Sequence, residues 1–350
     1  AAQDCYANQN NEFVFSVDFG VGNPGYYKVE GCEGTSPTLK VTRGVQYTIV
    51  QDDDSNWFHP VGLAYYPDGA LGSGGYAEVP ELEEPTPEDC DLTDFQCNPG
   101  TGVQQAPLYG VEGTYETIDN WNDGTTGGLD VYEPIFQRPL DQWQEQKPYG
   151  VRITIPTDSL TAEFFYFCHI HAGMSGRIEV EDPPTNANAL QFDLDPSTYY
   201  VTQDTFDMQC GTFGASPYQA SSDGSHALCP DMEFICDARD DLFSDCMRAI
   251  DCKMMADMRV TEPENNIALF MMQMIPHHEN AINMAKILLK EGPNEEGWTT
   301  GADDSWDMPG FLYSIINKQA AQVGDMQAWL DEYGYTSSVC PWAPVDNEVS

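Results

Sequence analysis

One short run of the sequence gathers three kinds of side chain that bind soft transition metals. Cys168, His171 and Met174 follow one another at Cys-x-x-His-x-x-Met spacing, directly after an aromatic run typical of a strand. A blue-copper site needs a thiolate, two imidazoles in a trigonal plane and a weak axial thioether. The run supplies three of these four ligands, so the fourth should be a histidine from a distant strand. Outside this run, His59 is the only histidine of the β-rich half.

The alternative for Cys168 is a disulfide, with the histidines as surface polar residues. The chain has eleven cysteines, and without Cys168 both halves hold an even number, so every other cysteine can pair within its own half. The pairing stays open, with three arrangements of the first set and fifteen of the second. The sets are Cys5, Cys32, Cys90 and Cys97, and Cys210, Cys229, Cys236, Cys246, Cys252 and Cys340.

A second group of soft ligands lies on an expected helix near the end of the chain. Met274 and His278 are four residues apart, and His277 and Met284 are seven apart, so each pair shares a helix face. Thioether and imidazole together favour Cu(I) over hard cations. Methionines at helical spacing are more often core filler, an alternative that is weaker for paired histidines. An antiparallel neighbour would bring a second methionine cluster opposite, formed by Met254, Met255 and Met258.

Short β-rich runs between Gly, Pro and Asx clusters fill the first half of the chain. They cover residues 13–17, 39–41, 46–50, 151–155 and 177–180. Between 66 and 149 this pattern fails, and so long an irregular stretch is typical of a functional or pinned insertion. We therefore expect a β-sandwich or barrel over residues 1–182, carrying a long insertion at 66–149.

The second half is predicted to be helical. A run rich in Pro and small polar residues favours a linker over 183–205. In the domain expected at 206–350, Met- and Ala-rich runs nearly free of glycine predict helices over 240–258 and 263–291. A third helix should run from about Gly310 to Tyr333.

The two ligand segments of the first half resemble the cupredoxin family, in particular its amicyanin- and plastocyanin-like members with a short ligand loop. The resemblance covers roughly residues 13–180 and is absent through the insertion. It implies a Greek-key β-sandwich with a type 1 copper site. His59, Cys168 and His171 would then be the equatorial ligands and Met174 the axial one, whereas His169 corresponds to no ligand of that pattern.

Residues 274–285 match the pattern Met-Ile-x-His-His followed by Ala-Ile-x-Met-Ala. This is the signature of the ferritin-like family catalogued as domain of unknown function 305, and residues 315–330 look like its closing helix. The resemblance covers about 240–333 and implies a four-helix bundle. Some members bind copper through His and Met, so it implies a second copper here. The six cysteines and the acidic insertion at 292–307 depart from the family pattern.

Charge and composition exclude several partners. Fourteen basic and fifty-seven acidic residues give a net charge of −43, which argues against nucleic acid and anionic membrane surfaces. The longest apolar run, 267–275, is about half of a membrane span, so we expect none. The cysteine content predicts a secreted protein, or one in an oxidising lumen or periplasm, and the N-terminal sequence predicts a mature form whose signal has been removed.

Three functions stay open on the sequence. The first is electron transfer by a single copper, with a redox or copper-transfer protein partner that presents a basic docking face. The second is copper sequestration, storage or chaperoning through the helical domain. The third is a structural or assembly protein, which should self-associate.

An electron carrier or copper-binding protein is expected rather than an enzyme. No hydrolase, kinase or dehydrogenase motif occurs, and one mononuclear copper cannot reduce dioxygen to water. Calcium is not predicted either, because the acidic runs 52–54 and 119–124 lack the spacing of a calcium loop.

Overall fold

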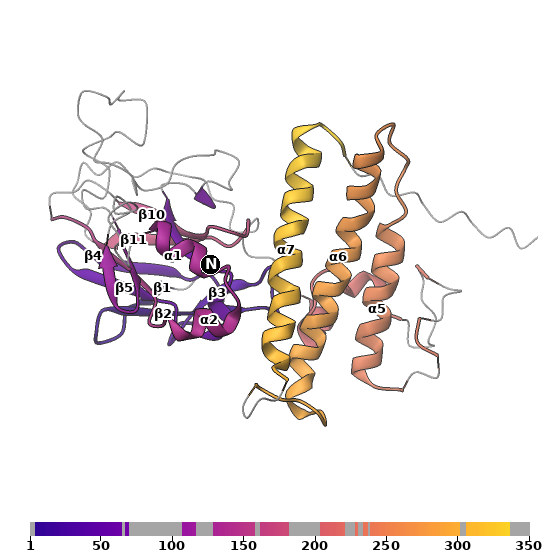
Figure 1. Ribbon diagram of the computed structural model, residues 1–350, viewed down its shortest axis with the longest axis horizontal. Coiled ribbons are helices and arrows are strands. Elements are labelled where there is room, and N and C mark those ends of the chain that lie inside the picture. The colour runs from indigo at the N-terminus through magenta and orange to yellow at the C-terminus, as the bar shows by residue number, and fades with distance from the viewer. Residues whose placement is uncertain are drawn as a thin grey trace, which may run out of the picture. The chain divides into compact units, whose positions relative to one another are not determined.

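The chain divides into a β-rich unit and a helical unit. One comprises Ala1–Asp18 and Gly25–Thr202, and the other comprises Phe19–Pro24 and Gln203–Ser350. In this computed structural model the predicted order, β-rich first and helical second, is confirmed (Figure 1). The predicted linker lies almost wholly outside the described residues, and the predicted domain limits stay predictions. The structure describes residues 4–64, 67–69, 107–116, 129–157, 162–181, 204–220, 228–229, 234–236, 239–301 and 306–336.

Two sheets form the β-rich unit where the structure describes it. A five-stranded sheet has the order β1-β4-β11-β10-β6, and a six-stranded sheet has the order β3-β2-β5-β9-β7-β8. The first contains β1 (Asp4–Tyr6), β4 (Thr38–Thr42), β11 (Gly176–Glu181), β10 (Glu163–Cys168) and β6 (Val61–Ala64). The second contains β3 (Tyr26–Val29), β2 (Glu12–Asp18), β5 (Gln46–Val50), β9 (Gly150–Thr154), β7 (Leu108–Val111) and β8 (Thr114–Glu116).

Alternating side chains explain how the sheets bury a common core. In β2 every second residue is buried, so Phe13, Phe15 and Val17 share the inner face. The ring of Phe15 lies 5.2 Å, between centroids, from that of Tyr166 on β10 of the other sheet. The sheets therefore pack face to face through aromatic side chains. A disulfide between Cys5 and Cys32 ties β1 to the segment after β3.

The insertion is not irregular throughout, and that part of the sequence prediction is wrong. Within 66–149 the structure places strands β7 and β8 and helices α1 (Leu129–Ile135) and α2 (Leu140–Glu145). The sequence pattern did not predict these elements because they are short, and because α1 carries Pro134 inside it. They bring Phe136 and Trp143 into an aromatic cluster with Tyr149, in which the Trp143 and Tyr149 rings stack at 5.0 Å.

Three long helices dominate the second unit: α5 (Leu242–Asp257), α6 (Asn266–Glu291) and α7 (Met308–Glu332). They confirm the three helices predicted from sequence. Each begins at a side-chain cap, in which Asp241, Asn265 and Asp307 accept a backbone N–H of the first turn. Helix α6 packs against both α5 and α7, and the shorter α4 (Thr205–Cys210) contacts α5 and α6 (Figure 1). No helix in the described ranges is long and apolar enough to span a bilayer.

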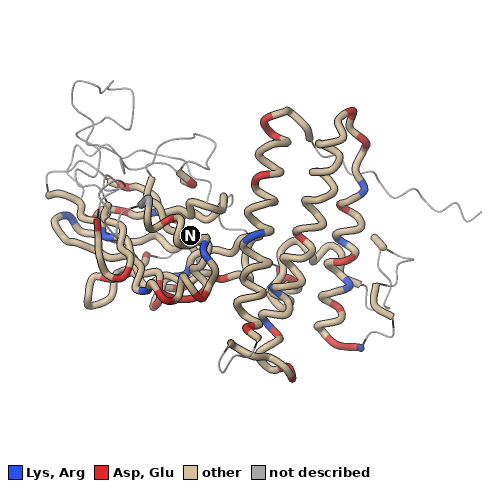
Figure 2. Tube along the Cα trace, viewed as in Figure 1, with Lys and Arg blue, Asp and Glu red and all other residues tan. Residues whose placement is uncertain are grey.

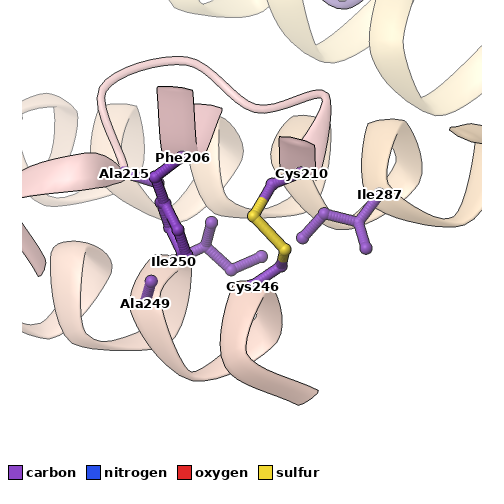
Figure 3. Close-up of a cluster of buried hydrophobic side chains, with 7 residues drawn as sticks. All are labelled: Phe206, Cys210, Ala215, Cys246, Ala249, Ile250 and Ile287. Carbon is purple, nitrogen blue, oxygen red and sulfur yellow. A yellow bond between two sulfur atoms is a disulfide. The ribbon is translucent and has the colours of Figure 1, made fainter. Parts of the chain in front are cut away.

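Two disulfides join described cysteines of the helical unit. One joins Cys210 to Cys246, and the other joins Cys229 to Cys252. The first sits inside an apolar cluster, where Ile250 and Ile287 flank the sulfur atoms (Figure 3). Cys236 is exposed and forms no disulfide with another described cysteine. Its predicted partners include Cys340, which like Cys90 and Cys97 lies outside the described residues.

Acidic residues are distributed along strands, loops and helices of both units, with few Lys and Arg among them (Figure 2). Several of the acidic residues have local structural roles. Asp54 pairs with Lys147 at 2.5 Å, and Asp52 accepts the backbone N–H of Tyr149 at 2.7 Å. The acidic run at 52–54 therefore stabilises the fold around α2.

Candidate metal centre

Strand pairing brings the predicted ligands of the β-rich unit together. His59 precedes β6, Cys168 ends β10, and His171 lies in the loop between β10 and β11. Strands β10 and β6 are antiparallel neighbours, with Cys168 opposite Val61. Residues 109 positions apart in the sequence thereby become adjacent. His59, Cys168 and His171 form a cluster that could hold a metal ion.

The distances within this cluster fit a shared ion. Cys168 Sγ lies 3.8 Å from Nδ1 of His59 and 3.6 Å from Nδ1 of His171. A sulfur at about 2.3 Å and a nitrogen at about 2.0 to 2.1 Å from one metal, at tetrahedral to trigonal angles, lie about 3.5 to 3.8 Å apart. The exposed fractions of the three residues are 0%, 0% and 3%. The sulfur-to-nitrogen distances therefore suit a soft cation in a buried site.

Burial keeps the thiol protonated when no cation is bound. It raises the pKa of Cys168 to about 12, and backbone N–H groups of Ile170 and His171 offset only part of the effect. The His171 N–H points at the sulfur from 3.4 Å. These N–H donors stabilise the thiolate relative to the thiol. When a cation displaces the proton, the sulfur is therefore already stabilised by the positive ends of backbone N–H groups.

Two further residues, His169 and Met174, belong to the ligand loop, the segment between β10 and β11. Met174 is fully buried three residues after His171. His169 is not part of the metal-binding cluster. Its backbone N–H donates to the carbonyl of Pro60, and its ring lies over Gly62, where a Cβ would approach Nε2 to 2.1 Å. Gly62 thus makes room for the His169 ring on the strand beside the ligands.

The turn that presents His59 is held by groups that sequence reasoning missed. The hydroxyl of Tyr27 donates to the His59 carbonyl at 2.9 Å, and the side-chain amide of Gln51 donates to the same carbonyl at 2.7 Å. Tyr132 donates to Gln51 in turn. No spacing rule finds these residues, because they come from separate parts of the chain, and Tyr27 and Gln51 act through a backbone carbonyl.

A buried carboxylate supports the ligand loop. One oxygen of Asp68 accepts the backbone N–H of Gly173 at 2.9 Å, next to Met174. The other oxygen is buried and has no hydrogen-bond partner among the residues described. Burial raises the pKa of Asp68 to about 6, although the Gly173 bond acts in the opposite direction.

Replacement of Asp68 by asparagine should stabilise the metal-free protein at pH 7. Between about pH 4 and 6 the folded state holds a proton that the unfolded state has lost, so the free energy of unfolding falls as pH rises through this window. Over the whole window the free energy of unfolding falls by about 3 kcal/mol. Asp68→Asn should remove this pH dependence and recover part of that energy at pH 7. Urea unfolding at pH 4.5 and 7 measures both effects, and an Asp68→Asn protein no more stable than the parent at pH 7 would contradict them.

The histidines of α6 lie near each other, with ring centroids 5.8 Å apart. His277 is exposed, whereas His278 is partly buried, and burial followed by the neighbouring His277 lowers its pKa. Nδ1 of His278 is buried without a hydrogen-bond partner in the described part of the chain. Met274 is half-buried and Met284 is 41% exposed. The methionines of the α5 end are half-buried as well, namely Met254, Met255 and Met258.

These residues do not form a second cluster of the kind found in the β-rich unit. Across the described residues, His59, Cys168 and His171 form the one group of three or more His, Cys, Asp or Glu ligands close enough to share an ion. A metal site on α6 would depend on thioethers, and it stays a prediction.

Comparison with known proteins gives one match. A family described as "Domain of unknown function (DUF305)" matches residues 268–341, which include most of α6 and all of α7. No curated protein and no solved structure matches the chain. The C-terminal helical region is therefore similar to the DUF305 family.

Proposed function

We propose that the β-rich unit is a cupredoxin-like domain that carries one type 1 copper and transfers electrons. The observation that supports this is the buried cluster of one sulfur and two Nδ1 atoms, with all ligand atoms within 4.8 Å of one another. His59, Cys168 and His171 would hold the metal, and Met174 would supply a weaker thioether ligand. Bound copper would alternate between Cu(II) and Cu(I).

The surroundings of the cluster favour electron transfer over chemistry on a substrate. The ligand residues are nearly inaccessible, with exposed fractions of 3% or less. Hydrogen bonds hold the His59 turn and the Cys168 sulfur, so the ligands should move little when the charge of the metal changes. Ala172, next to His171, is exposed. A redox partner could therefore approach the metal closely through the ligand loop.

Metal analysis and an electronic spectrum of the purified chain test this function. We expect one copper per β-rich unit and an intense visible band from thiolate-to-copper charge transfer, bleached reversibly by a mild reductant. A protein that binds copper without this band, or without a reversible couple, would not be a type 1 electron carrier.

Copper sequestration through the helical unit is the second candidate. It is favoured by the adjacent rings of His277 and His278 and by the unpartnered Nδ1 of His278. Similarity to DUF305 over residues 268–341 agrees with a helical fold there. Completion of a ferritin-like four-helix bundle is part of this proposal, since the described residues provide three long helices and the shorter α4.

Replacing both α6 histidines should lower the copper content without affecting the visible band. His277→Ala with His278→Ala removes the imidazoles, so thioethers alone would have to bind Cu(I). We expect the loss of about one copper per chain on anaerobic Cu(I) loading, measured by metal analysis. His226→Ala, in a Ser- and Gly-rich stretch, is the matched control. Equal copper content in all three proteins would exclude this second site.

The disulfides bear on the compartment of the protein, and its net charge bears on the kind of partner that it would bind. Three disulfides are compatible with an extracellular or otherwise oxidising compartment. With a net charge of −43, the protein would associate with a redox or copper-transfer partner through a basic docking face. Such association should weaken steeply as salt concentration rises.

A further inference from the structure

Gln51 occupies an unusual position next to the candidate metal centre, because every hydrogen-bonding site of its side-chain amide is used. Nε2 donates to the carbonyl of His59 at 2.7 Å and to Oδ1 of Asn56 at 3.1 Å. Oε1 accepts the backbone N–H of Val61 at 2.9 Å and the hydroxyl of Tyr132. An amide offers two donors and two lone pairs, so this buried group is saturated.

Two of these bonds hold the chain directly after His59, one of the proposed ligands. The carbonyl of His59 and the N–H of Val61 flank Pro60, so a single amide fixes the turn from the ligand into β6. Gln51 directly follows β5 of the six-stranded sheet, and Tyr132 belongs to α1. His59 leads into a strand of the five-stranded sheet. Its position is thus fixed by Gln51 from the six-stranded sheet side and, through Gln51, by Tyr132 of a helix in the insertion.

The same turn contains strained backbone that must be held from outside. Phe58 has a φ of 69°, a left-handed conformation that is costly for a bulky side chain. Its N–H donates to the carbonyl of Phe136 at 3.1 Å, just after α1. The indole of the neighbouring Trp57 donates to the carbonyl of Arg138 at 2.7 Å. The segment around α1 therefore restrains the residues before His59, and Gln51 restrains those after it.

We propose that Gln51 and Tyr132 are positioning residues that aim Nδ1 of His59 at the metal, so that α1 of the insertion tunes the metal centre. This inference rests on the proposed copper site. Groups that orient a metal ligand typically contribute about 10- to 100-fold to metal affinity. Tyr132 acts through Gln51, and Gln51 acts through the backbone of His59, so neither needs to touch the ion.

A pair of tyrosine variants separates positioning from general stability. Tyr132→Phe removes the hydroxyl that donates to Gln51 and keeps the ring. Tyr149→Phe is the matched control, because its buried hydroxyl donates to the carbonyl of Trp143 at 2.6 Å, within the same aromatic cluster. Gln51→Glu, which replaces the donating nitrogen by oxygen, is the stronger second variant. Thermal unfolding of each metal-free protein monitors folding.

The readouts are the copper dissociation constant, from competition with a chelator, and the electron paramagnetic resonance spectrum of the Cu(II) form. We expect Tyr132→Phe to bind copper about tenfold more weakly than Tyr149→Phe and to show altered hyperfine splitting. Gln51→Glu should have a larger effect in the same direction. If Tyr132→Phe and Tyr149→Phe have equal affinities and identical spectra, the positioning role is overturned.

Titration with Co(II) distinguishes failure of the positioning role from failure of the proposed copper function. A parent protein that lacks the blue band but binds Co(II) through Cys168 would refute type 1 copper. The Co(II) affinities of Tyr132→Phe and Tyr149→Phe would then decide the positioning role by the same tenfold criterion. A parent protein that binds neither metal would overturn both.

Discussion

Replacing Cys168 by serine should abolish the intense visible band of the copper-loaded protein. The band requires a sulfur-to-copper charge transfer, and a serine hydroxyl supplies neither the soft donor nor an accessible anion. Loss of a group that merely orients a ligand costs about 10- to 100-fold in affinity, so loss of the thiolate should weaken copper binding by at least about 100-fold. Spectra and chelator competition measure the two effects.

Cys236→Ser is the control for this experiment, because Cys236 is an exposed cysteine outside the metal cluster. It should keep the band and the affinity of the parent protein. An intact visible spectrum in Cys168→Ser would rule out the assignment of the sulfur ligand. A band lost equally in both variants would point to a general effect of cysteine replacement.

Removing the Cys210–Cys246 disulfide should destabilise the helical unit by about 4 kcal/mol. The bond closes a loop with a sequence separation of 36, and the entropy of such a loop in the unfolded chain accounts for roughly this amount. Cys210→Ala with Cys246→Ala also removes two sulfur atoms from the cluster around Ile250 and Ile287, which adds a packing cost (Figure 3). Guanidinium unfolding followed by far-ultraviolet circular dichroism at 222 nm monitors the helices.

The visible band provides an internal control for the disulfide variant. The copper ligands belong to the other unit, so the band of the folded variant should match that of the parent protein. A helical transition unchanged by the double replacement would show that packing, rather than the cross-link, stabilises α4 against α5.

Much of the architecture was predictable because its signals are local. Alternation predicts residues 46–50 as a strand, and β5 has the same limits. Long runs nearly free of glycine predict α5 and α6 to within a few residues, and apolar positions predict α7 as closely, because helix caps and apolar spacing are encoded nearby. Short elements such as α1 give no such signal, and their place depends on aromatic packing with distant residues.

The candidate site likewise has one part that local signals predict and another part that they do not. Ligand chemistry and loop spacing predict Cys168 and His171, and His59 follows as the remaining histidine of that half. Gln51 and Tyr132 could not be predicted, since Gln51 acts through backbone atoms of His59 and Val61 at a spacing typical of no motif, and Tyr132 reaches Gln51 across 81 residues. The supporting shell of a metal site is a property of the tertiary structure, whereas the ligand types are a property of the sequence.

The sequence separations of the sulfur atoms bear on how the chain reaches its native oxidation state. The three disulfides join cysteines 27, 36 and 23 residues apart, whereas Cys168 meets His59 across 109 residues. Closing a short loop costs less entropy than closing a long one, so the local pairs should form earlier during folding. Cys168 becomes inaccessible only when β10 pairs with β6. Early local oxidation would therefore remove competing thiols before Cys168, the proposed metal ligand, is enclosed, and so would help to keep its sulfur reduced.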